Sequence, residues 1–332
     1  MACIARRRGL WTLAACALLA GASGLGLAAP GKAGMRLERP LTIVVTFPPG
    51  GGTDLLARRL GEQLQQRLGQ PVVVENRPGA SGNIGAHAVA QAVPDGATLL
   101  MVNSSFAINP GVYERLDFDP RKDFTAVFNA GYIASVLVVP ADSPLRSLED
   151  ALAQGARREQ PLLFASCGNG TPQHLAGEML ARQAQRFVQH VPYKGCGPAA
   201  MAVAAGQVPA GMVTASSASA LIASGRMRAL AVTAPRRLAQ LPDVPTVAER
   251  GMPGFAVEQW HGLLAPARTP RAVVDALHGA LAEALRDPAL RTTLAEQGYS
   301  EARQTPQQFQ ALIAADIERY AAVTRSLGLR AD

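Results

Sequence analysis

Aromatic side chains make up only 5% of the 332 residues, and beyond residue 34 lysine occurs only at Lys122 and Lys194. So few rings leave no stacking platform for single-stranded nucleic acid. The formal net charge of +7 overstates the basic character, because residues 1–34 hold Arg6–Arg8 and Lys32 and no acid. The rest of the chain has 28 basic and 25 acidic side chains. We therefore expect no nucleic-acid partner, since such proteins carry a basic patch.

Metal-binding and catalytic patterns are also missing. No glycine-rich stretch is followed by Gly-Lys-Ser/Thr, and there is no G-x-G-x-x-G fingerprint. Cys167 and His174 suggest a cysteine nucleophile, but no acid is evident that would orient the histidine. We expect no metal, no cofactor and no enzymatic activity. The histidines have no metal-ligand spacing such as H-x-x-x-H; they are His87, His174, His190, His261 and His278.

Residues 1–34 are typical of a secretory signal peptide, with a charged start, the apolar stretch Leu10–Ala22 and small residues before a cleavage site. An uncleaved anchor is the alternative, but glycines and a proline interrupt this segment. Arg7 and Arg8 resemble a twin-arginine signal. Leu13–Cys16 resembles a lipobox that would place a lipid on Cys16, although the sequence stays apolar after it. We expect an exported mature chain in an oxidising compartment.

Strand and helix signals alternate along the mature chain. The β-branched run Leu41–Phe47 predicts a buried strand, and leucines at every fourth position predict a helix over 55–68. Alternation of this kind is typical of a parallel α/β sheet. It occurs twice and precedes a helical tail, which predicts two α/β lobes with a ligand between them. The further predicted strands are 72–75, 98–103, 136–140, 162–166, 187–191, 208–213 and 228–233, and the tail helices are 271–285, 288–297 and 307–325.

Four glycine-rich loops each join a predicted strand to a predicted helix: Pro48–Asp54, Arg77–Asn83, Ser166–Thr171 and Pro192–Gly197. Glycines let backbone N–H groups approach a ligand, and helix N-termini attract anions. We interpret Asp54 as an N-cap. Ligands bind beyond the carboxyl ends of the strands in open α/β sheets. The four loops, rich in N–H and hydroxyl donors, therefore predict recognition of a small carboxylate.

The motifs PPGGGTD, PVVVENRPGASGNIG, PDGATLLMVNSS, GNGTPQHLAGE, HVPYKG, LPDVPTVAERG and GLLAPARTP resemble the substrate-binding proteins of tripartite tricarboxylate transporters, also called Bug receptors. The resemblance covers essentially the whole mature chain. It implies an α/β, two-lobe periplasmic-binding-protein fold, type II-like, with the ligand in the interlobe cleft. We expect lobe 1 to comprise 35–135 plus 257–332, and lobe 2 to comprise 136–256.

The family implies a periplasmic receptor that delivers a carboxylated solute to membrane permease subunits. A ligand-sensing partner of a sensor kinase is the alternative, and an enzyme on the same scaffold is a third reading. The family's site carries over to matching positions in both lobes. In lobe 1 these are Phe47, Pro49, Gly50, Gly51, Thr53, Asp54, Ala80, Ser81, Gly82, Asn83, Asn103, Ser104 and Ser105. In lobe 2 they are Ser166, Gly168, Asn169, Thr171, His174, Tyr193 and Lys194.

Single residues in this set have two readings each. Lys194 is either a counter-charge for the ligand's distal group or a solvated loop residue, and His174 is either a ligand contact or a structural histidine. The family often has aspartate near Val213 and histidine at Phe106. The absence of the aspartate indicates a ligand without an ammonium group, which favours a plain dicarboxylate or an aromatic carboxylate.

Cys167 and Cys196 replace residues that are commonly small in the family, and both lie in glycine-rich loops after strands expected to be neighbours. Parallel neighbouring strands lie about 4.8 Å apart, within the roughly 4.4–6.8 Å between Cα atoms that a disulfide needs. Two free thiols that fill small-residue sites are the alternative. We favour a disulfide, since the compartment is oxidising and the two changes occur together.

Overall fold

The computed structural model describes residues 37–330. The predicted signal segment, with the twin-arginine pair and Cys16, lies outside these residues. Within the described part of the chain, no helix combines the length and apolarity needed to cross a membrane.

One group of strands is built from the two ends of the described chain. β1 (Leu41–Val45) lies between β2 (Val72–Asn76) and β3 (Thr98–Asn103), and both pairs are parallel. β3 then pairs antiparallel with β9 (Glu258–Pro266), which pairs antiparallel with β4 (Phe124–Pro140). The short β10 (Tyr299–Ser300) pairs with β4. The parallel strands match the predicted alternation, and β9 and β10 return from the far end of the chain.

A second group of strands comes from the middle of the chain. β5 (Leu162–Ser166) lies between β6 (Val188–Pro192) and β7 (Ala210–Thr214), again in parallel pairs. β7 and β8 (Met227–Val232) both pair antiparallel with the last residues of β4. The sequence predicted β3 and β5 with the bounds that the structure shows.

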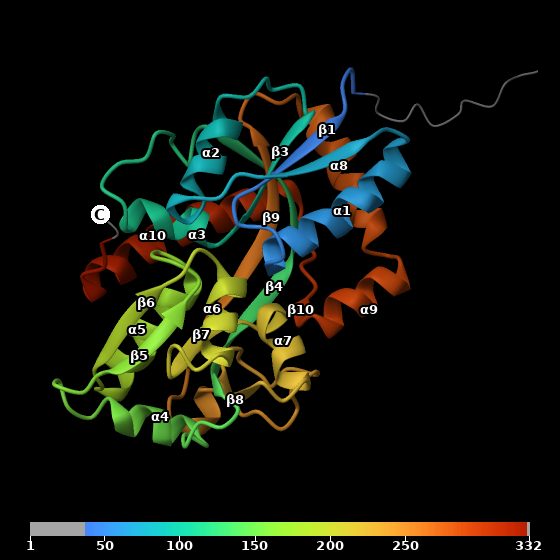
Figure 1. The fold of residues 1–332 in the computed structure, drawn as a ribbon. Coiled ribbons are helices and arrows are strands. Elements are labelled where there is room, and N and C mark those ends of the chain that lie inside the picture. The colour runs from blue at the N-terminus through green and yellow to red at the C-terminus, as the bar shows by residue number, and fades with distance from the viewer. Residues whose placement is uncertain (1–36, 331–332) are drawn as a thin grey trace, which may run out of the picture. The chain divides into compact units, whose positions relative to one another are not determined.

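β4 and β9 connect the two groups (Figure 1). Phe124–Ala134 pair with β9, whereas β4 from Ser135 onward pairs with β7 and β8. The prediction that a strand begins at Val136 was wrong, because β4 is 17 residues long. Two register shifts interrupt its pairing with β9, so its first half lacks a regular local pattern. The sheet is therefore mixed rather than wholly parallel.

The helices cover the strands and carry apolar residues at the spacing the sequence indicated. In α1 the predicted stripe is Leu56, Leu60, Leu64 and Leu68; the first three are fully buried, and Leu68 at the end of the helix is partly buried. The helices are α1 (Gly52–Leu68), α2 (Asn83–Ala90), α3 (Ser105–Ile108), α4 (Leu148–Gln154), α5 (Pro172–Ala184), α6 (Cys196–Ala204), α7 (Ala215–Ala223), α8 (Arg271–Ala284), α9 (Pro288–Glu296) and α10 (Pro306–Leu327). The described residues belong to one compact unit, and the predicted lobe boundaries stay a prediction.

Candidate functional site

The loop between β1 and α1 is organised by a buried carboxylate. The Asp54 side chain is about 2% exposed, and it accepts hydrogen bonds from the Gly50 N–H at 2.9 Å and from the Asn76 amide at 2.8 Å. It also pairs with Arg58 at 2.9 Å. Burial alone raises the pKa of Asp54, but the bonds from Arg58, Gly50 and Asn76 outweigh it, so the net pKa is lowered. All of its partners belong to the protein.

The interpretation of Asp54 as the N-cap was wrong, because Gly51 holds that position and makes no side-chain cap. Asp54 lies in the first turn of α1 and bonds back to the N–H before the cap. The N–H groups of Gly52 and Thr53 therefore remain without a carbonyl partner inside the helix, as in the first turn of any α-helix. An anion placed before this helix end meets free donors and the positive end of the helix dipole.

The loops after β2 and β3 are tied together by asparagines. The Asn109 amide donates to the Asn83 side chain at 2.6 Å and to the Ser81 carbonyl at 3.1 Å. Asn103 accepts from the Ser105 N–H at 2.9 Å. Ala80 and Ser81 have φ angles of 46° and 50°, a conformation that L-residues rarely adopt. Such strain is characteristic of ligand-binding segments.

The loops after β5 and β6 are joined covalently. Cys167 and Cys196 form a disulfide with a Cα–Cα distance of 4.3 Å. Beside it, the Gly195 N–H donates to the Cys167 carbonyl and the Tyr193 N–H donates to the Ser166 carbonyl, both at 3.1 Å. The segment that carries Lys194 is therefore held on both sides.

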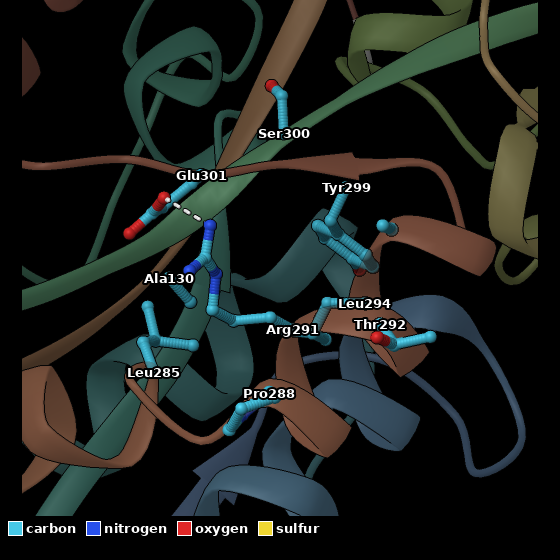
Figure 2. Close-up of a pocket in the computed structure, with 10 residues that line it drawn as sticks. Ala130, Leu285, Pro288, Arg291, Thr292, Leu294, Tyr299, Ser300 and Glu301 are labelled. Carbon is cyan, nitrogen blue, oxygen red and sulfur yellow. Dashed lines mark ion pairs between the residues drawn. The ribbon is translucent and has the colours of Figure 1, made fainter.

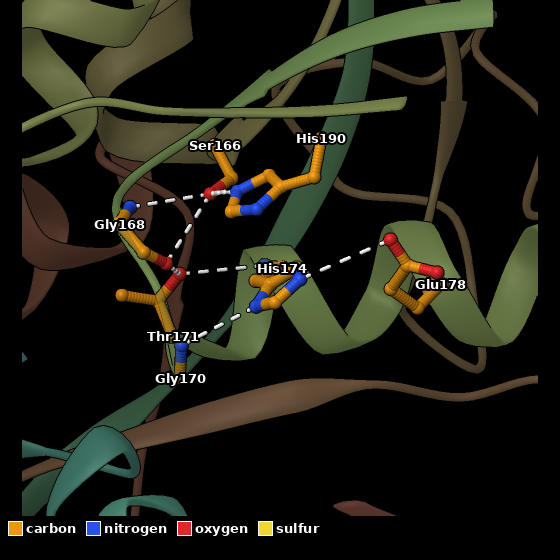
Figure 3. Close-up of polar contacts among 7 residues, drawn as sticks. All are labelled: Ser166, Gly168, Gly170, Thr171, His174, Glu178 and His190. Atoms are coloured by element: carbon orange, nitrogen blue, oxygen red, sulfur yellow. Dashed lines mark hydrogen bonds and ion pairs between the residues drawn. The ribbon is translucent and has the colours of Figure 1, made fainter. Parts of the chain in front are cut away.

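Behind these loops, two histidine rings stack with centroids 3.8 Å apart (Figure 3). His190 shares a hydrogen bond of 2.5 Å with the Ser166 hydroxyl, and His174 accepts from the Gly170 N–H at 3.3 Å. Thr171 caps α5 by accepting from the His174 N–H. Burial lowers the pKa of His174 to about 4, and burial with the neighbouring His174 lowers that of His190 to about 3. The pair is thus neutral at neutral pH and supports the loop from behind.

This neutral pair predicts a pH-dependent loss of stability. The pKa of each histidine is lower in the folded chain than the usual 6.5, so the unfolded chain binds protons first as the pH falls below 6.5. We expect the free energy of unfolding to fall over this window, with His174 contributing about 1 kcal/mol between pH 7 and 5.5. Urea titrations of wild type and His174→Gln measure the difference.

His87→Gln is the matched control, because His87 is an exposed histidine. It should keep the wild-type pH dependence. An equally steep pH dependence in His174→Gln would contradict the prediction.

The four loops surround two adjoining cavities. The larger has a volume of about 380 Å³, within the usual range for small-molecule sites. The smaller has about 30 Å³ and shares Phe47, Pro48, Cys167, Lys194 and Gly195 with it. Loops from both groups of strands also meet directly, since the Ser81 hydroxyl donates to the Asn169 carbonyl.

Lys194 is the only charged side chain among the described residues that line these two cavities. No ion pair joins it to any acid within residues 37–330. His261, which lines the smaller cavity, is neutral because burial lowers its pKa to about 3. The cavities therefore combine one uncompensated positive charge with neutral donors, which suits an anion of low charge.

The structure places the predicted site residues in two sets. Lining the two cavities, or the small cleft beside Asn109, are Phe47, Pro49, Gly51, Thr53, Ala80, Ser81, Gly82, Asn83, Asn103, Ser105, Gly168, Asn169, Tyr193 and Lys194. The residues that hold these loops without lining a cavity are Gly50, Asp54, Ser104, Ser166, Thr171 and His174.

Sequence reasoning missed the residues that β7 and β9 contribute. Thr214, Gln259 and His261 all line the smaller cavity. The His261 Nε2 shares a hydrogen bond of 3.1 Å with the Thr53 hydroxyl, and its Nδ1 has no partner although the residue is buried. A buried unpaired polar atom in a cavity wall is costly unless a ligand or water completes it. No local signal marks β9 as a strand, so the sequence does not predict that its side chains lie at the site.

Other cavities lie away from the glycine loops. One, of about 470 Å³, is lined by α9, β10 and the end of α8 (Figure 2). Among the described residues that line it, Arg291 is the only cation, and it faces Glu301 at 3.8 Å. An adjoining cavity of about 550 Å³ adds Arg286 and Arg303, which pair with Glu283 at 2.9 Å and Glu301 at 3.0 Å. Acids therefore neutralise these arginines, unlike Lys194.

Two strand groups, joined by β4 and β9 and closing glycine-rich loops on a shared cavity, define a two-lobe solute-binding protein of the periplasmic-binding type. The family model for the tripartite tricarboxylate transporter family receptor matches residues 56–329. The chain belongs to this receptor family, and the resemblance noted from its motifs is confirmed.

The relatives include receptors solved with ligands. Protein BugT of Bordetella pertussis is 36% identical over 92% of this chain and 94% of its own length. A Rhodopseudomonas palustris protein solved with adipate has a TM-score of 0.84 at 32% identity, covering 88% of this chain and 99% of its own. MatC from Rhodopseudomonas palustris, with bound malate, has a TM-score of 0.79 at 32% identity, covering 86% and 99%.

Proposed function

We propose that this chain is a periplasmic receptor that captures a small carboxylate between its lobes and delivers it to a membrane permease, without chemical change. The observation that carries the proposal is the unpaired Lys194 in a cavity whose other donors are neutral. Relatives solved with adipate and malate support a carboxylate as the ligand.

The donors suit a carboxylate at the glycine loops. Gly52 and Thr53, in the first turn of α1, line the smaller cavity, and their N–H groups have no carbonyl partner inside the helix. Charge-assisted hydrogen bonds of N–H and O–H donors to a carboxylate are about twice as strong as neutral ones. Asp54, whose charge would repel an anion, is already enclosed by Gly50, Arg58 and Asn76. We therefore assign Asp54 to loop organisation rather than to ligand contact.

Ligand release and capture follow from lobe closure. The Ser81–Asn169 hydrogen bond crosses between the two groups of loops, and a Cβ added at Gly52 would lie 2.5 Å from the Ser216 hydroxyl of α7. Contacts this close across the cleft must separate before a solute enters. A ligand that bridges both sides favours the closed state, as in other hinge-bending proteins.

A thermal-shift and calorimetric screen of the mature protein tests the proposal. The panel comprises acetate, adipate, malate, citrate, benzoate, 4-hydroxybenzoate and phenylacetate, with glucose and choline chloride as controls that carry no carboxylate. A ligand at 100 times its Kd should stabilise the fold by about 2.7 kcal/mol. A melting temperature raised by glucose or choline, and by no carboxylate, would contradict a carboxylate receptor.

A further inference from the structure

The larger cavity has walls of an unusual kind for a chain with so few rings. Three aromatic side chains line it, Phe47, Tyr113 and Tyr193. Only five tyrosines occur in the whole sequence, and two of them lie here. The disulfide at Cys167 adds a further apolar surface.

Prolines extend this surface from three of the loops. Pro48 follows β1, Pro78 follows β2 and Pro192 ends β6, and all three line the same cavity. Flat proline and aromatic faces suit a flat apolar body, and aromatic rings prefer offset or edge-to-face contact with another ring.

The charge balance limits the ligand to one carboxylate. Lys194 is the single cation among the described residues that line either cavity. A second carboxylate placed against these walls would have no counter-charge of its own, and removing an unpaired charge from water is unfavourable. The smaller cavity does not accommodate a second carboxylate either. Its volume is about 30 Å³, which is about the volume that one water molecule occupies in the liquid.

From this placement we propose that the ligand is an aromatic monocarboxylate. Its ring lies among Phe47, Tyr113 and Tyr193, and its carboxylate lies beside Lys194, where the larger cavity adjoins the smaller one and the first-turn N–H groups of α1. The smaller cavity beside His261 holds a water or one small polar substituent on the ring. This inference rests on the proposed carboxylate-receptor function and names a narrower class of ligand. That class differs from adipate and malate, the ligands in the solved relatives.

Isothermal titration calorimetry of the mature protein tests the class. The aromatic probes are benzoate, 4-hydroxybenzoate and phenylacetate; the others are cyclohexanecarboxylate, adipate and malate. We expect the best aromatic probe to bind at least tenfold more tightly than adipate and malate, and more tightly than cyclohexanecarboxylate. If adipate or malate binds within tenfold of it or better, the aromatic class is wrong and the carboxylate receptor stands. If no carboxylate binds, the proposed function fails as well.

Two variants of Tyr193 test whether this side chain of the larger cavity contacts the aromatic ring of the ligand. Tyr193→Leu should weaken the best aromatic probe at least fivefold more than it weakens cyclohexanecarboxylate, because only the aromatic probe loses a ring contact. Tyr193→Phe keeps the ring and should retain the preference. Circular dichroism and melting temperature establish that both variants fold. An equal loss for both probes in Tyr193→Leu would overturn the assignment of the ring to this wall.

Discussion

Replacing Lys194 with glutamine is expected to weaken binding of the best carboxylate in the panel by about 10- to 100-fold. Hydrogen bonds to charged groups contribute about 1.5–3 kcal/mol, and about 1.4 kcal/mol corresponds to a factor of ten. No other cation among the described residues lines the two cavities, so no neighbour replaces the lost charge. Calorimetric titration of the purified variant measures the change in Kd directly.

Lys122 provides the matched control, since it is the only other lysine beyond residue 34. It pairs with Asp119 at 3.1 Å on the surface, outside every cavity described above. Lys122→Gln should leave the affinity unchanged. The wild-type affinity should also fall with added salt, because an exposed ammonium is screened, and this salt dependence should be smaller in Lys194→Gln. An unchanged Kd in Lys194→Gln would make Lys194 a solvated loop residue.

Local sequence patterns predicted most of the elements that position the loops. Short apolar runs bounded by glycine and proline predicted β3 and β5 with the observed bounds. These elements are short and their signals lie within the element itself. The four glycine-rich loops also converge as expected, because parallel strands place their carboxyl ends at one edge.

The antiparallel strands were not predictable in the same way. Phe124 of β4 pairs with Pro266 of β9, so the partner that stabilises each strand lies about 140 residues away in the sequence. Bulges near Phe128 and Gly131 interrupt the regular pattern of β4. Because the sequence does not predict β9, the predicted site lacks His261 and Gln259, although both are buried beside the smaller cavity. Long-range pairing of this kind leaves no periodic signal in a single sequence.

The roles of residues inside a predicted loop depend on packing that the sequence does not show. Asp54 was assigned to the cap position from its place before a leucine-rich helix, but Gly51 occupies that position. The sequence allows His174 to be either a ligand contact or a structural histidine. It lies behind the loop, stacked on His190 and bonded to the Gly170 N–H. The position of a residue along the chain predicts whether it lies near the site. Side-chain packing then determines whether it contacts the ligand or supports the loop.

Removing the disulfide should have the largest effect on stability of any change considered. The bond closes a loop of 29 residues, for which the chain-entropy model gives about 3–4 kcal/mol. We expect Cys167→Ala/Cys196→Ala to lose about that much of its free energy of unfolding in urea. Ligand affinity should also fall, because the bonded residues flank the loop that presents Lys194 and line both cavities.

Thiol titration and reduction distinguish the loss of the disulfide from the loss of side-chain packing at the two cysteines. Thiol titration of the unfolded, unreduced mature protein should find no reactive thiol, and two per chain would rule the bond out. A reductant should destabilise the wild type toward the level of the double variant and leave the double variant unchanged. Alanine is a suitable replacement at Cys167, which is only about 3% exposed, because it introduces no polar group into the core. If the reduced wild type stays as stable as the oxidised protein, the bond contributes nothing and the loop around Lys194 is held by its backbone hydrogen bonds alone.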